Sequence, residues 1–349
     1  MKLITKLGVL CCIFALNASH ANYTYSDCEP PCKEPCACPN SIFVTGEYLY
    51  WKPSQGGMPY ALSVSSVNGI PLGAENTEIH QESKWGSGFR IDAGVNMPEA
   101  STDLSVSWTH FHHTAHSFND DPFILGTQLL GPNNSFTLGG SGSGAGPAAS
   151  KWNLRLDSVE FNLGYHLISG QRYMLRPYIG VAGTRLNQTQ TITYTNFLDT
   201  GNAVFLNATI IQKNQFHGFG PKLGIQGDWI LGNGFGLMGN LATTFYYGES
   251  KNPVEAHVLN DPIGFPLSDY VVHYEKHRVI PAFQGQVGVT WSLVTTNTLS
   301  VELSALYEVQ YFVGTWRNQS SQIQNLYISD AGFENLMLNG FTGQLTISF

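Results

Sequence analysis

Four cysteines lie close together near the start of the chain, where two kinds of chemistry are open to them. They occupy the stretch CEPPCKEPCAC as Cys28, Cys32, Cys36 and Cys38. In an oxidising compartment such a cluster forms disulfides, and the alternative is a zinc site of four thiolates. The C-x-C end and the three prolines fit a tetrahedral ion poorly, so the sequence favours disulfides. The spacing leaves open whether these bonds lie within one chain or between chains.

A second cluster contains imidazoles, which bind metals or exchange protons. It consists of His110, His112, His113 and His116. Only Asp120 and Asp121 lie near these histidines, without a firm ligand spacing, so we predict a solvated loop rim. The same residues could imitate the Asp/His pair of a barrel protease, but no such set faces them at a predictable distance. We therefore predict no metal, no cofactor and no enzymatic activity.

The composition indicates which class of protein carries these groups. Charged residues make up 12% of the 349 residues, about half the share of a typical soluble domain. The 17 basic residues are outnumbered by 25 acidic ones, which argues against nucleic-acid binding. A barrel in lipid needs no charge on its outer surface, so this composition favours a membrane β-barrel over a soluble β-sandwich.

The first residues resemble a secretory signal. Lys2 and Lys6 precede the apolar run LGVLCCIFAL, and Ser19-His20-Ala21 is a small-x-small cleavage site. We predict a signal peptide at 1–21, a Cys/Pro-rich periplasmic segment at 22–42 and an outer-membrane barrel at 43–349. No later run is long and apolar enough to predict a transmembrane helix.

The rest of the chain alternates apolar and polar residues with period two, which is typical of strands that face lipid on one side and a lumen on the other. In 299–311, for example, the odd positions from Leu299 to Tyr311 are apolar or aromatic, and the even positions include Glu302 and Glu308. We expect an all-β fold, a transmembrane antiparallel up-and-down barrel of about ten strands. The predicted strands are 43–52, 86–97, 102–112, 156–167, 172–185, 216–230, 233–247, 277–292, 297–313 and 336–349.

The predicted connections alternate between long and short. The short ones are Pro98 to Ser101, Ser169-Gly170-Gln171, Leu231-Gly232 and Val294 to Thr296, and the long ones are 53–85, 113–155, 186–215, 248–276 and 314–335. Outer-membrane barrels have short periplasmic turns and long outer loops. We therefore expect both termini in the periplasm. Thr189–Thr195 and Ala203–Gln212 also read as strand, and we expect this hairpin to extend the wall above the membrane.

Aromatic residues gather near the predicted strand ends, as in the headgroup belts of membrane proteins. They are Tyr48, Tyr50, Trp51, Trp108, Trp152, Tyr173, Trp229, Tyr246, Tyr247, Trp291 and Tyr311. Core packing in a sandwich is the alternative. The chain ends in an alternating strand with a final Phe349, which looks like the signal by which barrels are inserted.

The polar faces of the predicted strands carry seven acids and four bases. We predict that these side chains face the lumen: Glu47, Arg90, Asp92, Asp103, Glu160, Arg176, Lys222, Asp228, Arg278, Glu302 and Glu308. In a water-filled lumen they would set ion preference. In a narrow lumen they must pair with one another, because buried charges need partners.

Four short motifs, taken in their order along the chain, resemble the Legionella-type major outer-membrane protein family. They are GEYLYW at 46–51, LRPYIG at 175–180, GFGPKLG at 218–224 and LYEVQYF at 306–312. The resemblance covers about 43–349, whereas the Cys/Pro-rich segment at 27–39 is not part of that pattern and is more like the envelopes of chlamydia-like bacteria, where disulfides link proteins.

The resemblance implies a pore-forming outer-membrane barrel that passes small solutes or ions and has a structural role in the envelope. The alternative is a surface-exposed structural or adhesive barrel with a closed lumen, because ten strands make a narrow barrel. We expect outer-membrane lipid, small solutes or ions and disulfide-linked envelope proteins as partners, and no nucleic acid.

Overall fold

The computed structural model describes most of the chain from Ser41 onward, and its elements are strands. The described residues are 41–67, 70–97, 100–120, 124–125, 147–169, 172–199, 204–259, 269–272, 275–296, 299–317 and 333–349. This part of the chain contains no helix that is long and apolar enough to cross a membrane. The predicted signal peptide and cysteine segment lie outside the described residues.

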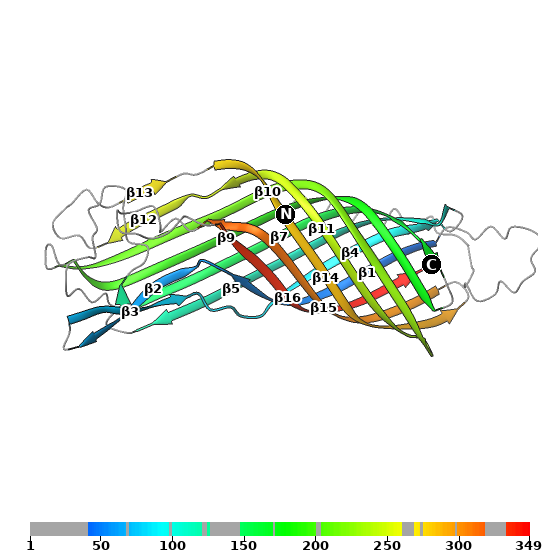
Figure 1. Cartoon of the computed structure of the whole chain (residues 1–349), viewed down its shortest axis with the longest axis horizontal. Helices are drawn as coiled ribbons and strands as arrows, with labels where there is room; N and C mark the ends of the chain where they lie inside the picture. The colour runs from blue at the N-terminus through cyan, green and yellow to red at the C-terminus, as the bar shows by residue number, and fades with distance from the viewer. Residues whose placement is uncertain are drawn as a thin grey trace, which may run out of the picture.

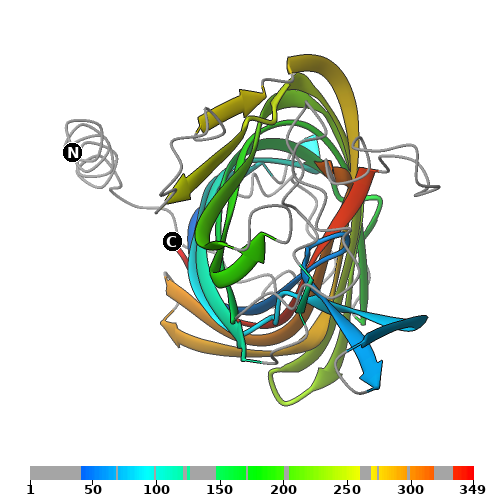
Figure 2. The same ribbon diagram turned by 90° about the vertical axis from the view of Figure 1, so that its left-hand side faces the viewer.

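Ten long strands form a closed antiparallel barrel, which confirms the predicted fold class (Figures 1 and 2). They are β1 (Ser41–Gln55), β4 (Gly86–Met97), β5 (Thr102–Asn119), β7 (Ala148–Tyr165), β9 (Tyr173–Asp199), β10 (Val204–Gly232), β11 (Phe235–Lys251), β14 (Glu275–Thr296), β15 (Leu299–Arg317) and β16 (Phe333–Ser348). Each pairs with the next, and β16 pairs with β1 to close the ring.

The alternation of the sequence explains which way the side chains point. Along β5, for example, odd-numbered residues from Asp103 to Ser117 are buried, while several of the even-numbered ones are exposed. Exposed apolar side chains cover the outside of the ring, among them Ile91, Val159, Ile179, Phe219, Leu241, Val287 and Leu303. A strand face exposed in this way is expected where the solvent is lipid.

The connections between barrel strands are long at one end and short at the other. The short ones join β4 to β5, β7 to β9, β10 to β11 and β14 to β15. The first and last strands also meet at the short end, where the backbones of Ile42 and Phe349 exchange hydrogen bonds of 2.8 and 2.9 Å. The long end carries the additional strands β2 (Pro59–Val67), β3 (Ile70–His80), β6 (Ile124–Leu125), β12 (Val254–Leu259) and β13 (Asp269–Val272).

Two predicted turns were placed too early. The β10–β11 hairpin turns at Asn233-Gly234 rather than Leu231-Gly232, because both residues have positive φ (54° and 78°), the backbone of the favoured two-residue Asn-Gly turn. Strand β14 continues through Thr296, so 294–296 belong to the wall. The two other short turns include 98–99 and 170–171, which lie outside the described residues. The dipeptide β8 (Ile168–Ser169) pairs with β9 beside the second of these turns.

Several strands are longer than predicted, because pairing continues beyond the apolar segments. Strands β5 and β7 pair as far as Asn119 with Ala148, inside the predicted loop 113–155. Strands β9 and β10 pair as far as Asp199 with Val204. The predicted hairpin in 186–215 is therefore a direct extension of the barrel wall, as expected.

Candidate functional site

The barrel interior changes in character along each strand. Going along β9 from the short end, the inward residues are first Arg176 and Tyr178, then Ala182 and Leu186, and finally Gln188. On β15 the inward Glu308 likewise precedes the apolar Phe312 and Trp316. We call the innermost ion pairs the charged belt, formed by Glu47, Arg90, Glu160, Lys222 and Glu308. The apolar cluster lies between this belt and the long end.

Arg90 is at the centre of the charged belt. Its guanidinium donates to Glu308 (Nη2–Oε1, 2.8 Å), to Glu47 (Nη1–Oε2, 2.7 Å) and to the hydroxyl of Thr109 (2.9 Å). Strands β4 and β15, which carry Arg90 and Glu308, are separated by β1 and β16 in the sheet. Their ion pair therefore crosses the interior rather than following the wall.

Glu308 is fully buried, with 0% of its surface exposed. Besides Arg90, its carboxylate accepts hydrogen bonds from three glutamine amides and one hydroxyl: Gln284 (3.0 Å), Gln286 (2.9 Å), Gln310 (2.9 Å) and Thr342 (3.1 Å). A buried carboxylate is tolerated when its lone pairs are satisfied in this way. Sequence analysis missed the three glutamines, although their even positions on β14 and β15 place them on the face of Glu308.

A second ion pair continues the belt around the other side of the lumen. Lys222 Nζ donates to Glu160 (2.5 Å) and to the amide oxygen of Gln284 (3.1 Å). Because Gln284 also donates to Glu308, the two ion pairs belong to one network. This network joins β1, β4, β7, β10, β14 and β15 and fills the section of the barrel where it lies.

A separate charged group lies nearer the short end. Arg176 makes a two-pronged ion pair with Asp103 and donates to Gln226 (3.3 Å), whose amide in turn donates to Asp228 (3.1 Å). His166 also approaches Asp103, with 3.3 Å between Nε2 and Oδ2. These residues are on β5, β9 and β10, with His166 directly after β7, so this group too is held by several strands.

Three of the eleven predicted lumen charges, Asp92, Asp228 and Glu302, have no ion pair within the described part of the chain. Asp92 has a buried carboxylate oxygen without a hydrogen-bond partner there. Within the described residues, Glu302 accepts a hydrogen bond from the hydroxyl of Ser292 (3.0 Å). Arg278 lies toward the long end, with its guanidinium 4.3 Å from the ring centre of Phe333.

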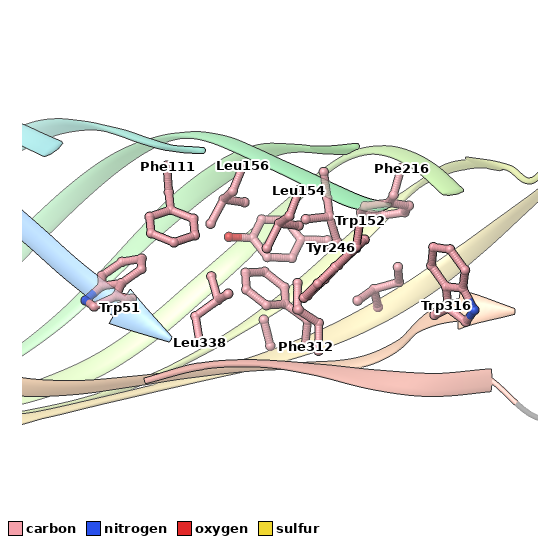
Figure 3. Packing of buried hydrophobic residues seen from close by; sticks show 14 of the residues in the cluster. Trp51, Phe111, Trp152, Leu154, Leu156, Phe216, Tyr246, Phe312, Trp316 and Leu338 are labelled. Atoms are coloured by element: carbon pink, nitrogen blue, oxygen red, sulfur yellow. The ribbon is translucent and has the colours of Figure 1, made fainter. Parts of the chain in front are cut away.

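The apolar cluster fills the interior beyond the belt (Figure 3). Its members come from most barrel strands and are almost fully buried: Leu49, Trp51, Met58, Phe111, Trp152, Leu154, Leu156, Ala182, Leu186, Phe216, Tyr246, Ile280, Ala282, Phe312, Trp316, Leu336 and Leu338. Sequence analysis assigned three of these, Trp51, Trp152 and Tyr246, to the headgroup belt, and that assignment was wrong. Trp51 is four residues from Glu47, so the period of two already placed both on the inner face.

A small cavity of about 20 Å³ lies where the belt meets the apolar cluster. A space of this size holds about one water molecule. Its lining combines both regions: Thr109, Ser158, Glu160, Thr244, Tyr246, Ala282, Phe283, Gln284, Gln310 and Phe312. In this conformation side chains therefore close the lumen at the belt and beyond it.

The four histidines of the second cluster do not converge. His110, His112 and His116 share the outer face of β5, while His113 points inward and packs edge-on against Trp152, with 5.7 Å between ring centres. The described residues accordingly contain no group of three side chains able to hold a metal ion. The cysteines of the first cluster lie outside the described residues.

Comparison with known proteins identifies one matching family. The family described as the Legionella pneumophila major outer membrane protein precursor matches residues 33–349. The match begins ten residues before the region of the resemblance and takes in Cys36 and Cys38, so part of the cysteine segment does belong to the family pattern. No curated protein sequence matches the chain.

Solved barrels resemble the structure only distantly. The Pseudomonas putida toluene transporter TodX is 8% identical, with 88% of this chain and 89% of that chain covered and a TM-score of 0.26. A Pseudomonas aeruginosa FadL homologue is 6% identical, with 89% and 90% covered and a TM-score of 0.26. These scores are too low to support any argument about function.

Proposed function

Since the chain belongs to the family of the Legionella pneumophila major outer membrane protein, we propose that it is an outer-membrane channel for small ions or solutes, with the charged belt as its constriction. The side chains of the belt must rearrange before anything passes. No catalytic step is part of this proposal.

The observation that carries the proposal is the buried charge itself. Arg90, Lys222, Glu160 and Glu308 lie in the middle of a membrane barrel, where a well-packed apolar filling would serve stability equally well. Ionisable groups inside a membrane protein are costly, and they usually mark the path of an ion or substrate. Within the described residues the belt consists of side chains from the wall strands, so the opening step that we propose is a rearrangement of these side chains.

The eleven predicted lumen charges determine the expected ion selectivity. Seven acids and four bases are spread along the proposed path, so small cations should pass more readily than anions. The screening length at physiological salt is about 8 Å, comparable to the width of a narrow lumen. The preference should therefore weaken as the salt concentration rises.

Planar-bilayer recording of the refolded barrel tests the proposal. We expect small conductance steps and a reversal potential, across a salt gradient, that indicates cation preference. Glu302→Gln should move that potential toward zero, because Glu302 has no cation partner in the described chain. The matched control is Glu249→Gln, which removes one acid from the outer face of β11. Anion preference, or equal shifts in both variants, would contradict this lumen.

The alternative function is a structural or adhesive barrel, and the closed interior favours it. In that case the charged belt stays paired, and the refolded protein shows no conductance over any voltage the bilayer tolerates. The Glu302→Gln variant would then show no conductance either. The outer-membrane location is common to both functions.

We also propose an orientation and a set of partners. The long end would face outward and both termini the periplasm, by the general rule for such barrels. A cysteine introduced at Gly142 or Asn260 should then react with an impermeant reagent on intact cells, and one at Gly170 should not.

Cys28, Cys32, Cys36 and Cys38 would form disulfides, including some to other envelope proteins. Non-reducing gels that show only monomer would exclude the latter.

A further inference from the structure

The outer face of β5, β7 and β9 changes abruptly from apolar to basic. Trp108 on β5 lies opposite Val159 on the neighbouring strand β7, and both belong to the outer apolar surface. In the next outward position toward the long end, His110 lies opposite Asp157, and Asp157 lies opposite Arg185. Polar side chains predominate from there to the end of the strand pairing, where Phe118 lies opposite Ala149.

Positive charge dominates this surface, which we call the basic patch. It contains Lys151, Arg155 and Arg185 with His110, His112 and His116, against the single acid Asp157. The strand register brings these groups together, because His112 lies opposite Arg155 and His116 lies opposite Lys151. Directly opposite residues on one face of a sheet are close neighbours, with Cβ atoms about 5 Å apart. In a protein with a formal net charge of −8, such a concentration is unusual.

Asp157, the one acid of the basic patch, already has two partners. Asp157 pairs with His110 (Nδ1–Oδ1, 2.6 Å) and accepts from Arg155 (Nε–Oδ2, 2.8 Å). More than half of the Arg155 side chain, 56%, remains exposed. Lys151 and Arg185 are exposed and have no ion pair within the described residues. The patch therefore retains cationic groups that are free to bind a further anion.

The neighbouring outer face shows that this excess is local. On β10 to β14, at the corresponding level, Lys213 pairs with Glu255 (2.6 Å), and Lys251 lies between Glu249 (3.2 Å) and Glu275 (3.3 Å). Cations there are matched by acids. A solvated rim alone does not explain why one side of the same barrel is balanced and the other is not.

We infer that the basic patch binds the phosphorylated headgroup of a membrane lipid. The patch adjoins the apolar surface, at the level where the edge-on pair Phe89 and Trp108 (5.1 Å between ring centres) marks an aromatic boundary. Headgroup phosphates lie at that level. Guanidinium groups bind phosphate through two parallel hydrogen bonds, and a lysine adds a point charge. The inference does not depend on whether the lumen conducts.

The test is equilibrium binding of diphosphorylated lipid A to the refolded barrel in uncharged detergent. A triple variant, Lys151→Gln, Arg155→Gln and Arg185→Gln, should bind this lipid on the order of a hundredfold more weakly, at about fivefold per cation removed. The matched control removes three outward cations elsewhere, Lys52→Gln, Lys213→Gln and Lys251→Gln, and should bind nearly as the unmodified protein does. The gel shift between unheated and boiled samples confirms folding.

Three further measurements keep the inference open to refutation. Asp157→Asn should strengthen binding, because it removes the competing carboxylate. Lipid A without phosphates should bind unmodified protein as weakly as the triple variant binds the phosphorylated lipid. Millimolar inorganic phosphate should not displace the lipid, and displacement would mean a site for free phosphate instead. If the triple variant does not fold, Arg185→Gln alone should weaken binding about fivefold. Equal losses in the triple variant and its control would overturn the inference.

Discussion

The charged belt and the apolar cluster lie next to each other inside one ten-stranded wall, but they are held by different forces. Glu308 and Arg90 are fixed by hydrogen bonds of defined direction, which come from the neighbouring strand β14 and from across the interior between β4 and β15. Leu338 and Trp316 are fixed by close packing against other apolar side chains, which has no direction. Side chains of the charged belt can exchange hydrogen-bond partners. The apolar cluster has no such partners to exchange, and it can only gain or lose packed volume.

The largest effect is expected where one partner of the charged belt is removed. Glu308→Ala leaves Arg90 buried with Glu47 as its remaining carboxylate, and it leaves three glutamine amides without their acceptor. Removing one member of a buried ion pair typically costs about 3–5 kcal/mol. The free energy of unfolding in urea, measured in vesicles, should fall by that amount.

The control for this variant retains the shape and removes the charge. Glu308→Gln should cost less than Glu308→Ala, because one amide oxygen still accepts hydrogen bonds from the neighbouring donors. Replacing Arg90 by Met, Glu308 by Leu and Glu47 by Gln together should cost less than Glu308→Ala alone, since no charge is stranded. If this triple variant is the least stable, the belt is not held by electrostatics.

A slightly smaller effect is expected in the apolar cluster. Leu338→Ala removes a fully buried side chain and should cost about 2–4 kcal/mol, through lost burial and the cavity that remains. Like the cost at Glu308, this cost should scarcely change with the salt concentration, because solvent ions reach neither region. The matched control is Leu303→Ala on the outer face, which should cost less because lipid chains fill the space. Equal costs would mean that the inner cluster is loosely packed.

The contrast between the two regions also explains what the sequence could reveal. Charge on one face of an alternating strand has only one favourable place in a membrane barrel, so the inner face of β15 could be predicted from Glu302 and Glu308. Near the long end the alternation involves apolar residues on both faces, as at Trp51 and Tyr50 on β1. There the residue type no longer separates inside from outside, and Trp51, Trp152 and Tyr246 were assigned to the wrong surface.

Strand ends and partner choice were also beyond the sequence. The wall continues past the predicted strands because β5 and β7 pair through residues such as His116 and Lys151, whose polarity resembles that of a loop. The pairing of Arg90 with Glu308 depends on which strands meet across the closed ring. That follows from the register of ten strands, which no local pattern specifies.

The smallest effect is expected for an ion pair that lies on the outer face of the barrel. Lys213 and Glu255 form an ion pair of 2.6 Å on the outer face, with 31% and 27% of their side chains exposed. Lys222 and Glu160 form one of 2.5 Å inside, with 4% and 16% exposed. A double-mutant cycle for the outer pair, with Lys213→Met and Glu255→Gln, should give a coupling energy of about 0.2–1 kcal/mol that falls with added salt.

The equivalent cycle for the inner pair, with Lys222→Met and Glu160→Gln, should give a larger coupling that added salt scarcely changes, because solvent ions do not reach the pair. The salt dependence is therefore the decisive measurement. If the inner coupling falls with salt as steeply as the outer one, water and ions already enter the belt, and the lumen is open more often than this conformation suggests. Such a result would weaken the contrast between the two regions and strengthen the case for a channel.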